Sequence, residues 1–560
     1  MASTGIEPAS IAPELDPTDP WAREAQTFPR LSPEMAARLA RYGSEESLPA
    51  QTVLFSRGDR GADFFFVLEG AIEILDTADD GTPHVMRSHR EHQFSGELTQ
   101  FNDRQILVSG RTGPASRVVR VKRADFRRLV TGEPDIGEIV MRAFILRRVG
   151  MLRHGQAGVV LIGPAHSADT LRLEQFLTRN GYPHRLIDTE HDGAATGFLE
   201  CFGVVPSELP VVIVPGDRAL RNPSLAALAD DLGLTENFDH ESVFDVAVVG
   251  AGPAGLAAAV YAASEGLQTI VVESLAPGGQ AGTSSKIENY LGFPTGISGQ
   301  ALAGRAQVQA QKFGARLAVS RAVTGLECDD TPYQLRLEDG AAIRTRAIVI
   351  ATGARYRKLD VPGYEAYEGQ GIYYAATAME ADLCRDVEVI VVGGGNSAGQ
   401  AAVFLAGSAK HVHVLIRSAG LAATMSDYLV QRIERSAHIS LHAHSEVSAL
   451  AGAPALERVT WRNRRSGAET TRPVSAIFAM IGAEPNTRWI GDCLALDAQG
   501  FVVTGSKAGA SADSPYATSR PGVYAVGDVR SGSVKRVAAG VGEGSVVVQA
   551  VHRFLHPAAA

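Results

Sequence analysis

Residues 245–259 read Asp-Val-Ala-Val-Val-Gly-Ala-Gly-Pro-Ala-Gly-Leu-Ala-Ala-Ala, a hydrophobic strand followed by a GxGxxG turn and the small-residue start of a helix. In such a turn Gly250 makes the bend, Gly252 lets the backbone approach a pyrophosphate, and Gly255 lets helix and strand pack closely. The next hydrophobic stretch ends in Glu273, roughly 20 residues after the second glycine, where a carboxylate holds a ribose hydroxyl. This stretch therefore predicts a dinucleotide-binding α/β domain.

A second glycine turn repeats the pattern further along the chain. Residues 387–398 read Val-Glu-Val-Ile-Val-Val-Gly-Gly-Gly-Asn-Ser-Ala, and an Ala-rich stretch follows. The predicted binding residues are Gly393, Gly395, Asn396, Ser397 and Ala398. The next strand ends in Arg417, and a cation there favours the 2′-phosphate of NADPH over NADH. The alternative for Arg417 is a solvated arginine at a strand end. We predict two Rossmann-like domains and two nucleotides.

Length and composition limit the remaining classes of protein. At roughly 100 to 200 residues per domain, 560 residues predict three or four domains, which excludes a single small binding module. Fifty-eight glycines, 45% hydrophobic and 6% aromatic residues indicate an α/β chain with an aliphatic core. The net charge of −9 gives no basic excess for neutralising phosphates, so nucleic acid is not an expected partner.

The cysteines and the composition of the N-terminal residues indicate the cellular compartment in which we expect the protein. The four cysteines are far apart and form no CxxC, which argues against a disulfide framework and against a zinc site: Cys201, Cys328, Cys384 and Cys493. No apolar run approaches the ~18 residues of a membrane span, and the Pro-rich, acidic start is unlike a signal peptide. We expect a cytoplasmic protein without membrane attachment, and a mobile tail over residues 1–25.

The N-terminal part, residues 26–154, predicts a β-roll closed by a helix. Short apolar stretches between Thr52 and Lys122 are broken by glycines, as in a β-roll or sandwich. Residues 123–148 then carry apolar side chains at three- and four-residue steps, which predicts one helix.

From Phe244 to about Leu555 the chain resembles the low-molecular-weight thioredoxin reductases. Besides the two glycine turns, the matching pieces are Gly278-Gly-Gln280, Glu288-Asn289-Tyr290, Ala351-Thr-Gly353, Gly527-Asp528 and Arg536-Val-Ala538. The resemblance implies an FAD-binding domain over residues 243–361 and 486–560, with an NAD(P)H-binding domain, 362–485, inserted between them. It also implies FAD contacts from Gln280, Asn289, Gly527, Asp528 and Ala538. The chain departs from the family at Val537, where a glutamine is usual.

The redox dithiol of that family is missing. Where the family has Cys-Ala-Thr-Cys, residues 375–378 read Ala-Ala-Thr-Ala, so Ala375 and Ala378 occupy the cysteine positions. Alanine forms neither a thiolate nor a disulfide. The nearest cysteine, Cys384, is interpreted as a small buried hydrophobe.

Residues 155–238 resemble a thioredoxin or glutaredoxin domain. The resemblance rests on Arg179-Asn-Gly-Tyr-Pro-His184, on a strand ending in Asp188 and on Leu209-Pro210-Val211, where the family has a cis proline. The expected helix begins without a cysteine, so disulfide exchange is excluded here too. The alternative is an unrelated small α/β domain.

The stretch Phe94-Ser-Gly-Glu-Leu98, followed by Arg104, resembles the phosphate-binding cassette of cyclic nucleotide-binding domains. Backbone N–H groups beside Gly96 and Leu98 can hold a phosphate, Glu97 can accept from a ribose hydroxyl, and Arg104 can pair with the charge. Residues 105–108 depart from the family, which usually has a small residue after the arginine. The alternative is a sensor that has lost its ligand.

Three histidines near residue 440 raise the question of a metal. His438, His442 and His444 alternate along an expected strand without carboxylate or cysteine ligands, so we interpret them as a solvated strand face and predict no metal.

Together these features predict an FAD-dependent NAD(P)H oxidoreductase fused to a cyclic nucleotide-binding-like domain and a thioredoxin-like domain. Hydride is expected to pass from NADPH to FAD and on to an external acceptor: oxygen, a quinone or a redox protein. A cyclic nucleotide is the expected regulator and a homodimer the expected assembly. The alternatives are a ferredoxin- or flavodoxin-type NADP reductase, a thioredoxin-disulfide reductase acting by an unseen route, and a non-catalytic flavin or nucleotide sensor.

Overall fold

The computed structural model of the chain describes residues 19–77, 83–102, 104–154, 158–165, 167–192, 195, 199, 203–215, 218–235, 242–284, 287, 290–368, 371–374, 376, 381, 384–453, 455–509 and 514–557. These residues fold into two compact units. The first contains the chain up to Gly353 and from Thr487 onward, and the second is Ala354–Asn486. The second unit is therefore an insertion in the first.

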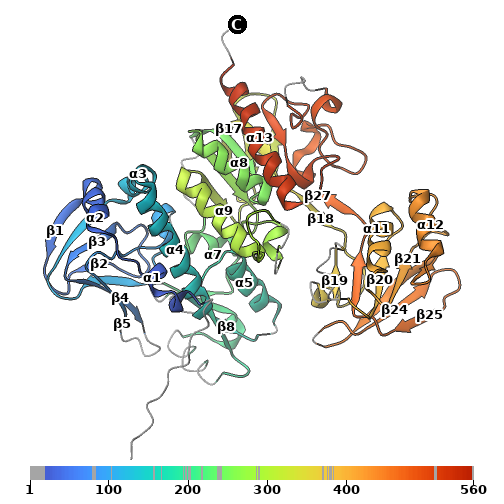
Figure 1. Ribbon diagram of the computed structural model, residues 1–560, viewed down its shortest axis with the longest axis horizontal. Helices are drawn as coiled ribbons and strands as arrows, with labels where there is room; N and C mark the ends of the chain where they lie inside the picture. Colours follow the sequence, from blue (N-terminus) through green and yellow to red (C-terminus); the bar gives the residue numbers. More distant parts are fainter. Residues whose placement is uncertain are drawn as a thin grey trace, which may run out of the picture. The chain divides into compact units, whose positions relative to one another are not determined.

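The N-terminal part of the first unit is a β-roll, as predicted (Figure 1). Its antiparallel sheets have the orders β1-β7-β3 and β2-β6-β4-β5. The strands are β1 Ser44–Leu48, β2 Val53–Phe55, β3 Phe64–Glu69, β4 Ala71–Thr77, β5 Pro83–Arg90, β6 Ser109–Thr112 and β7 Ser116–Val121. Alternation along β3 divides its side chains between two cores: Phe64 and Phe66 pack with the helices, whereas Phe65 and Val67 pack between the sheets.

The helix predicted over residues 123–148 is two helices, α3 Arg123–Gly132 and α4 Pro134–His154. Pro134 has no N–H to donate and its fixed φ suits the first turn of a helix, so a new helix starts there. The 21-residue α4 also runs further than expected. It contacts the short N-terminal helices and carries the chain from the β-roll to the next sheet.

The predicted mobile tail is wrong for residues 19–25. A 3₁₀ turn at Pro20–Ala22 and the helix α1 (Glu24–Thr27) precede α2 (Pro33–Leu39). Trp21 stacks against His154, whose Nε2 lies 2.8 Å from a carboxylate oxygen of Asp19. These contacts with the end of α4 order the segment. Residues 1–18 lie outside the described residues.

The next sheet has the order β11-β10-β8-β9, in which β8 and β9 are parallel and the other pairs antiparallel. Its elements are β8 Val159–Gly163, α5 Ala168–Arg179, β9 His184–Asp188, β10 Val211–Val214, β11 Arg218–Arg221 and α7 Leu225–Asp231. The predicted strands and helix are present, and the Leu209–Pro210 peptide is cis. The thioredoxin-like assignment of this sheet stays a prediction.

The rest of the first unit is built on a sheet of order β14-β13-β12-β17-β16-β15, with β28 added beside β17. The elements are β12 Val243–Val249, α8 Pro253–Ser264, β13 Thr269–Glu273, α9 Gly299–Phe313, β14 Arg316–Val319, β15 Val323–Glu327, β16 Tyr333–Leu337, β17 Ala342–Ile350, β28 Val523–Ala525 and α13 Val537–Leu555. Strands β14, β13, β12, β17 and β28 are parallel. β12 and β13 are almost continuously buried, as expected for parallel strands covered on both faces.

Close packing of α13 on α8 closes this domain, and Figure 1 shows the two helices side by side. A Cβ placed at Gly544 would overlap the backbone carbonyl of Ala254, so glycine is required there. A Cβ at Gly540 would lie 3.5 Å from the Ala254 Cβ. These glycines bring the C-terminal stretch against the helix that follows the first glycine turn.

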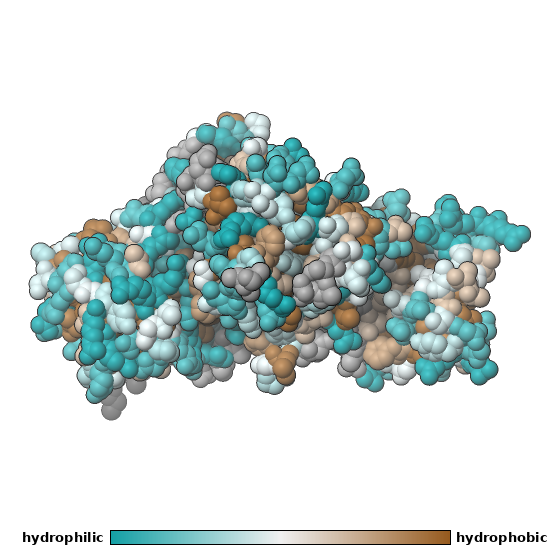
Figure 2. Space-filling view, turned by 90° about the horizontal axis from the view of Figure 1, so that it is seen from above, coloured by the Kyte–Doolittle hydropathy of each residue, from teal (hydrophilic) through white to brown (hydrophobic). Residues whose placement is uncertain are grey.

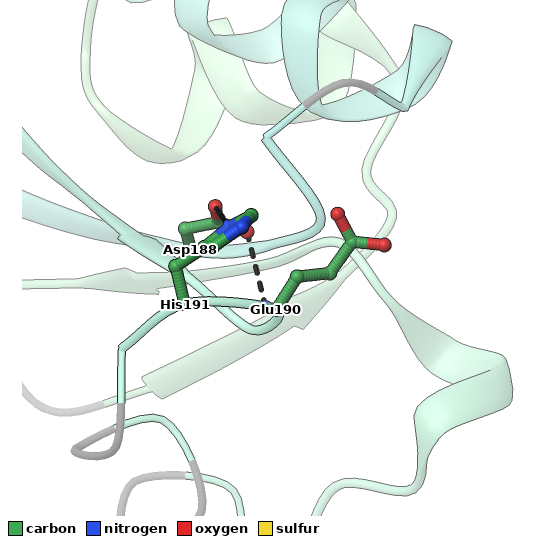
Figure 3. Close-up of side chains that lie close together, drawn as sticks. All are labelled: Asp188, Glu190 and His191. Atoms are coloured by element: carbon green, nitrogen blue, oxygen red, sulfur yellow. Dashed lines mark hydrogen bonds and ion pairs between the residues drawn. The ribbon is translucent and has the colours of Figure 1, made fainter.

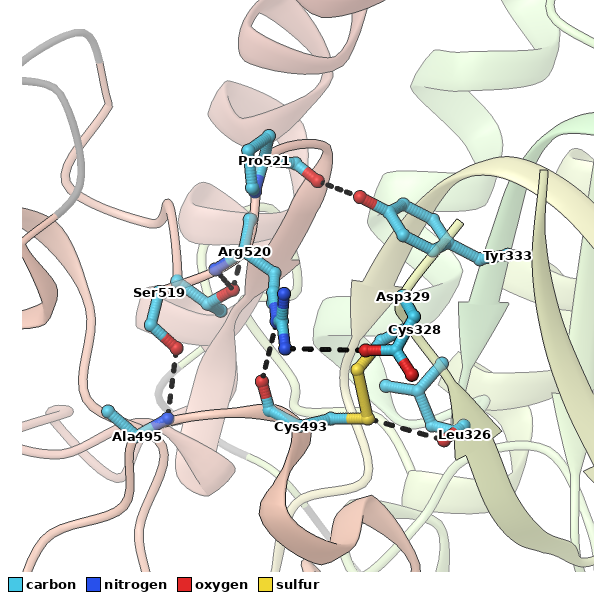
Figure 4. Close-up of a disulfide and its surroundings, with 10 residues drawn as sticks. Leu326, Cys328, Asp329, Tyr333, Cys493, Ala495, Ser519, Arg520 and Pro521 are labelled. Carbon is cyan, nitrogen blue, oxygen red and sulfur yellow. Dashed lines mark hydrogen bonds and ion pairs between the residues drawn. A yellow bond between two sulfur atoms is a disulfide. The ribbon is translucent and has the colours of Figure 1, made fainter. Parts of the chain in front are cut away.

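One disulfide corrects the expectation that the cysteines are unpaired. Cys328, after β15, is bonded to Cys493, in the 3₁₀ segment Arg488–Cys493 (Figure 4). Their Cα atoms are 6.1 Å apart, within the usual disulfide range, although 165 residues separate them. The inserted unit accounts for most of that separation, and cysteine spacing alone cannot reveal such a pair.

The second unit has a parallel sheet of order β19-β26-β20-β21-β22 and a small antiparallel sheet β23-β24-β25. Its elements are β18 Ala354–Tyr356, β19 Ile372–Tyr373, β20 Glu388–Val392, α11 Asn396–Leu405, β21 His411–Leu415, α12 Asp427–Arg435, β22 Ile439–His442, β23 Ser445–Ala451, β24 Arg458–Asn463, β25 Glu469–Arg472, β26 Ala476–Ala479 and β27 Ala483–Pro485. β18 pairs with β27, so the two ends of the insertion lie together.

On the face shown in Figure 2, hydrophilic residues predominate and hydrophobic ones form small separate groups. Among the described residues, no helix is both long and apolar enough to span a membrane.

The Gly544 contact makes a testable prediction. Gly544→Ala should lower the thermal unfolding midpoint, because the added methyl group forces α13 away from α8, a strain that typically costs about 1–3 kcal/mol. Gly542→Ala in the same helix is the matched control, since nothing lies within 4 Å of its Cβ position. The control should be neutral or slightly stabilising, because alanine is the better helix former. Equal midpoints for the two variants would show that this contact is dispensable.

Candidate functional site

The first glycine turn has the backbone geometry that its sequence predicts. Gly250 has a φ of +103°, and a Cβ there would overlap the carbonyl of Ala351. A Cβ at Gly255 would overlap the carbonyl of Gly250. Gly252, by contrast, has open space around its Cβ position, and as the N-cap of α8 it offers no side-chain cap. The first N–H groups of α8 are thus available to an anion such as a pyrophosphate.

Glu273 lies at the end of β13, beside this turn. One carboxylate oxygen accepts a hydrogen bond from the Ala251 N–H at 2.9 Å, and the other accepts from the Leu275 N–H at 3.0 Å. Two backbone donors therefore fix the carboxylate at the place where the sequence predicts a ribose contact.

Segments far apart in the sequence meet at this turn. A Cβ at Gly279 would lie 3.1 Å from the Gly252 Cα, and one at Gly527 would lie 3.0 Å from the Ala254 Cβ. Gln280 follows as the N-cap of the 3₁₀ turn Ala281–Thr283. The predicted FAD contacts of these segments therefore belong to one site. Asn289 lies outside the described residues.

Asp528 stands at the end of β28, in the 3₁₀ turn Gly527–Val529. Partial burial raises the pKa of its carboxyl, with Lys535 opposing the shift and Glu543 adding to it. Sequence reasoning missed Glu543, which accepts from the Gly527 N–H at 2.6 Å and pairs with Arg530 at 2.6 Å. Glu543 thus fixes the turn that presents Asp528.

Ala538 is the second residue of α13, whose N-cap provides no side-chain hydrogen bond. The first turn of α13 is consequently a second helix N-terminus with open N–H groups. Gly527 and Gly540 both pack on Ala254 of α8. The start of α13 therefore lies in the C-terminal segment that packs beside the first glycine turn.

The second glycine turn, in the other unit, has the same construction. Gly393 has a φ of +142°, a Cβ there would overlap the carbonyl of Met480, and Gly395 is the uncapped N-cap of α11. Ala398 is fully buried at the third glycine's place. The Asn396 side chain accepts from the Ser426 N–H at 2.7 Å, so it positions a neighbouring loop, whereas Ser397 is exposed.

Arg417 follows β21 beside this turn. The Gly393 N–H donates to Leu415 near the end of β21 at 3.1 Å, and the Ser418 hydroxyl lies 4.0 Å from the Cβ position of Gly394. Arg417 is exposed and makes no ion pair with any residue that the structure describes. Its guanidinium is accordingly accessible to a phosphate at the glycine turn.

The positions of the missing dithiol, Ala375 and Ala378, lie outside the described residues. Cys384 is 1% exposed and belongs to the apolar core of the second unit, which confirms its interpretation as a buried hydrophobe.

The predicted cyclic nucleotide site is only partly assembled. Gly96, with a φ of +113°, and Glu97 line a cavity of about 370 Å³, but Leu98 and Arg104 are not among its lining residues. Glu97 pairs with Arg148 of α4 at 3.4 Å. Burial raises the pKa of the Glu97 carboxyl, and the charge of Arg148 opposes this shift.

The predicted solvated histidine face is wrong for His442. Its Nε2 lies 3.1 Å from Nδ1 of His413, which is 5% exposed and whose other nitrogen lies 3.1 Å from Glu388. Burial lowers the pKa of His413, and burial with the neighbouring His413 lowers the pKa of His442 to about 4. These histidines are therefore part of a polar network within the second unit.

A further group escaped sequence reasoning. Asp188, Glu190 and His191, at the end of β9, have ligand atoms within 4.8 Å of one another (Figure 3). Both carboxylate oxygens of Asp188 already have partners within the protein. One accepts from the Ala165 and Glu190 N–H groups, and the other pairs with His191 at 2.7 Å. The hydrogen bonds within this exposed group explain its geometry without a metal ion.

Comparisons with known proteins identify the family. Residues 244–544 match the family described as pyridine nucleotide-disulphide oxidoreductases. The chain belongs to this family. A thioredoxin reductase of Treponema pallidum is 32% identical over 315 residues, covering 56% of this chain and 98% of that protein. The crystal structure of the Streptococcus pyogenes thioredoxin reductase is 32% identical, with a TM-score of 0.50 over 56% of this chain and 98% of that one.

Not every similar protein is named a thioredoxin reductase. An NADH dehydrogenase of Bacillus subtilis is 29% identical over 352 residues, covering 62% of this chain and 66% of that protein. Residues 45–133 match the cyclic nucleotide-binding domain. The predicted oxidoreductase class, the FAD and pyridine nucleotide cofactors and the N-terminal domain type are thus confirmed at the level of families.

Glu273 allows a direct test of the first nucleotide site. Glu273→Ala should release FAD during gel filtration, because it removes the ribose acceptor and the anchor of the Ala251 N–H. The matched control is Glu265→Ala, which removes an exposed glutamate that pairs with His552 at the far end of α8. Flavin absorbance per chain measures the effect. If both variants retain FAD equally, Glu273 is not a ligand of the nucleotide.

Proposed function

We propose that this protein takes reducing equivalents from NADPH and passes them through FAD directly to an external acceptor, without a protein dithiol. The observation that carries this proposal is the contrast between two well-formed glycine turns and the two alanines of the redox segment. Gly252 and Gly395 keep the open backbone that nucleotide binding needs, whereas Ala375 and Ala378 have no sulfur.

The bound cofactors supply the chemistry, hydride transfer from the nicotinamide to the flavin. The chain's own residues supply binding and orientation. N–H groups at the starts of α8 and α11 bind pyrophosphates, and Glu273 accepts from a ribose hydroxyl. Arg417 favours NADPH through a charge-assisted contact with the 2′-phosphate.

The cysteines of the chain give no evident substitute for the dithiol. Cys384 is buried and Cys328 is bonded to Cys493, while Cys201 lies outside the described residues. The name of the Bacillus relative, NADH dehydrogenase, indicates that relatives of this chain are not restricted to thioredoxin reduction. Oxygen, a quinone and a redox protein are the proposed acceptors.

A purely structural nucleotide fold is the alternative in another class. The exposed Arg417 beside Gly394 argues against it, because a domain that binds no phosphate gains nothing from an isolated cation at that place. We also propose that two copies of the chain form a homodimer.

We also propose that a ligand of the N-terminal domain regulates the reductase, with a cyclic nucleotide as the candidate that the family match names. The proposed connection is α4. Its Arg148 pairs with Glu97 of the cassette and donates to the Gly181 carbonyl of the next domain at 3.2 Å. Met151 of α4 lines the cavity and joins an apolar core that also contains Val246 of β12.

Arg417 gives the test of nucleotide choice. Arg417→Ala should reduce the ratio of kcat/KM for NADPH over NADH roughly ten- to a hundredfold, the value of one hydrogen bond to a charged group. Arg458→Ala, an exposed arginine on the separate β23-β24-β25 sheet, is the control and should leave the ratio unchanged. An unchanged ratio in Arg417→Ala would remove the argument for NADPH.

The alanine pair gives the test of the electron path. Under anaerobic conditions NADPH should bleach the flavin of the wild type, yet thioredoxin-coupled disulfide reduction should be absent because Ala375 and Ala378 can form no disulfide to accept the electrons. The double variant Ala375→Cys, Ala378→Cys should acquire that activity, and either single variant is its control. Substantial activity in the wild type that persists after Cys384→Ser would contradict the proposed path.

A further inference from the structure

The cavity in the N-terminal domain has a composition that its family match does not explain. It is lined by residues of β4 and β5, of the 96–100 segment and of α4, and its volume is about 370 Å³. That volume is within the range of about 300–1,000 Å³ that is common for small-molecule sites. The lining residues therefore indicate what kind of molecule fits.

Four charged side chains line the cavity, and one of them has no counterion. Three are matched by ion pairs: Arg87 with Glu24, Asp63 with Arg120 at 2.7 Å and Glu97 with Arg148 at 3.4 Å. Arg147 is 6% exposed and makes no ion pair within the described part of the chain. Glu97 of the same wall attracts Arg147 electrostatically but forms its ion pair with Arg148, so Arg147 is the lining cation without an ion pair of its own.

The Arg147 guanidinium is held in place by two hydrogen bonds, but one of its nitrogens has no hydrogen-bond partner. Its Nε donates to the Thr27 carbonyl at 3.0 Å and its Nη1 to the Gly96 carbonyl at 2.9 Å, while Nη2 is buried without a hydrogen bond. Its Cζ lies 4.9 Å from the centre of the Phe94 ring. Burial lowers the Arg147 pKa to about 9, with the charge of Arg87 adding to the shift. A buried cation in this state is stabilised by any anion that reaches it.

Other buried polar atoms of the lining also have no partner. Nδ1 of His89, Oε1 of Glu97 and Oε1 of Gln100 are buried and make no hydrogen bond, and the three residues are 3%, 9% and 5% exposed. Unsatisfied buried groups of this kind are uncommon in native proteins and are often completed by a ligand or by water.

The rest of the wall is apolar: Phe55, Ile74, Met86, Ile106 and Val108. These five side chains offer no hydrogen-bond partner, so this part of the wall suits an apolar group. The predicted phosphate ligand Arg104 is also absent from the lining. An anionic group on an apolar body matches Arg147 and this part of the wall.

We propose that this cavity binds a small amphipathic carboxylic acid in place of the cyclic nucleotide that the family match names, a medium-chain fatty acid being the simplest example. Its carboxylate pairs with Arg147, and its apolar body packs against the β-roll. The assignment concerns binding alone and does not depend on the reductase reaction.

The test is isothermal titration calorimetry on the full-length protein with decanoate, below its micelle concentration. Two partial probes separate the contributions: 1-decanol has the tail without the charge, and propionate has the charge with little tail. Decanoate should bind at one site per chain, and decanol should bind roughly ten- to a hundredfold more weakly because it lacks the charge-assisted contact. Propionate should bind weakly because it buries little apolar surface.

Substitutions in α4 test whether Arg147 contacts the carboxylate of decanoate. Arg147→Gln should weaken decanoate binding by the same ten- to a hundredfold and leave decanol unchanged. Arg142→Gln is the matched control, since Arg142 is an exposed residue of α4 that pairs with Glu138 and does not line the cavity. Met86→Trp places a larger side chain in the apolar part of the cavity and should abolish decanoate binding. This variant provides the test if Arg147→Gln does not fold.

Three results would overturn the proposal. One is the absence of decanoate binding to the wild type up to millimolar concentration. Another is equal affinity for decanoate and decanol, or an Arg147→Gln affinity equal to that of the wild type. The third is tighter binding of cAMP or cGMP that displaces decanoate and is lost in Arg104→Gln, which would return the cavity to the cyclic nucleotides.

Discussion

The contact between the backbone of Ala254 and Gly544 holds the two halves of the flavin domain together. Because Gly544 has no Cβ, α13 lies directly on the backbone of α8, the helix that begins at the first glycine turn. This packing brings Gly527 against Ala254 and so sets Asp528 beside a turn that is more than 250 residues earlier in the chain. The inserted second unit can leave and re-enter the domain because this contact, and the pairing of β28 with β17, close it independently.

Helix α4 has a comparable role at the other end of the first unit. Its adjacent residues Arg147 and Arg148 bind different partners: Arg147 donates to backbone carbonyls of the N-terminal domain, whereas Arg148 joins Glu97 to the domain that follows. The cavity and the next domain therefore contact the same turn of this helix. This arrangement is the basis of the regulation that we propose, since one helix touches both the cavity and the core shared with the flavin domain.

The first nucleotide site and the N-terminal cavity differ in how their polar groups are satisfied. Beside the first glycine turn two carboxylates are fixed by hydrogen bonds: Glu273 accepts two backbone hydrogen bonds, and Glu543 fixes the Gly527 turn. In the cavity, Arg147 and His89 keep buried atoms without partners. The first pattern is that of a preformed backbone cradle, and the second is that of a site completed by its ligand.

The sequence by itself determined the local chemistry of this protein. The glycine turns and the acid at the end of β13 are readable because each depends on neighbours a few residues away. The alanines in place of the dithiol are recognised through the resemblance to the thioredoxin reductases. The sequence also predicted the β-roll and most strands, but it joined α3 and α4 and left residues 19–25 unfolded. Only the tertiary structure decided what depends on distant residues: the Cys328–Cys493 bond across the insertion, the burial of His442 against His413, and the buried charge of Arg147. The physical reason is that burial and pairing are properties of packed surfaces, and contacts between residues so far apart leave no periodic trace in the chain.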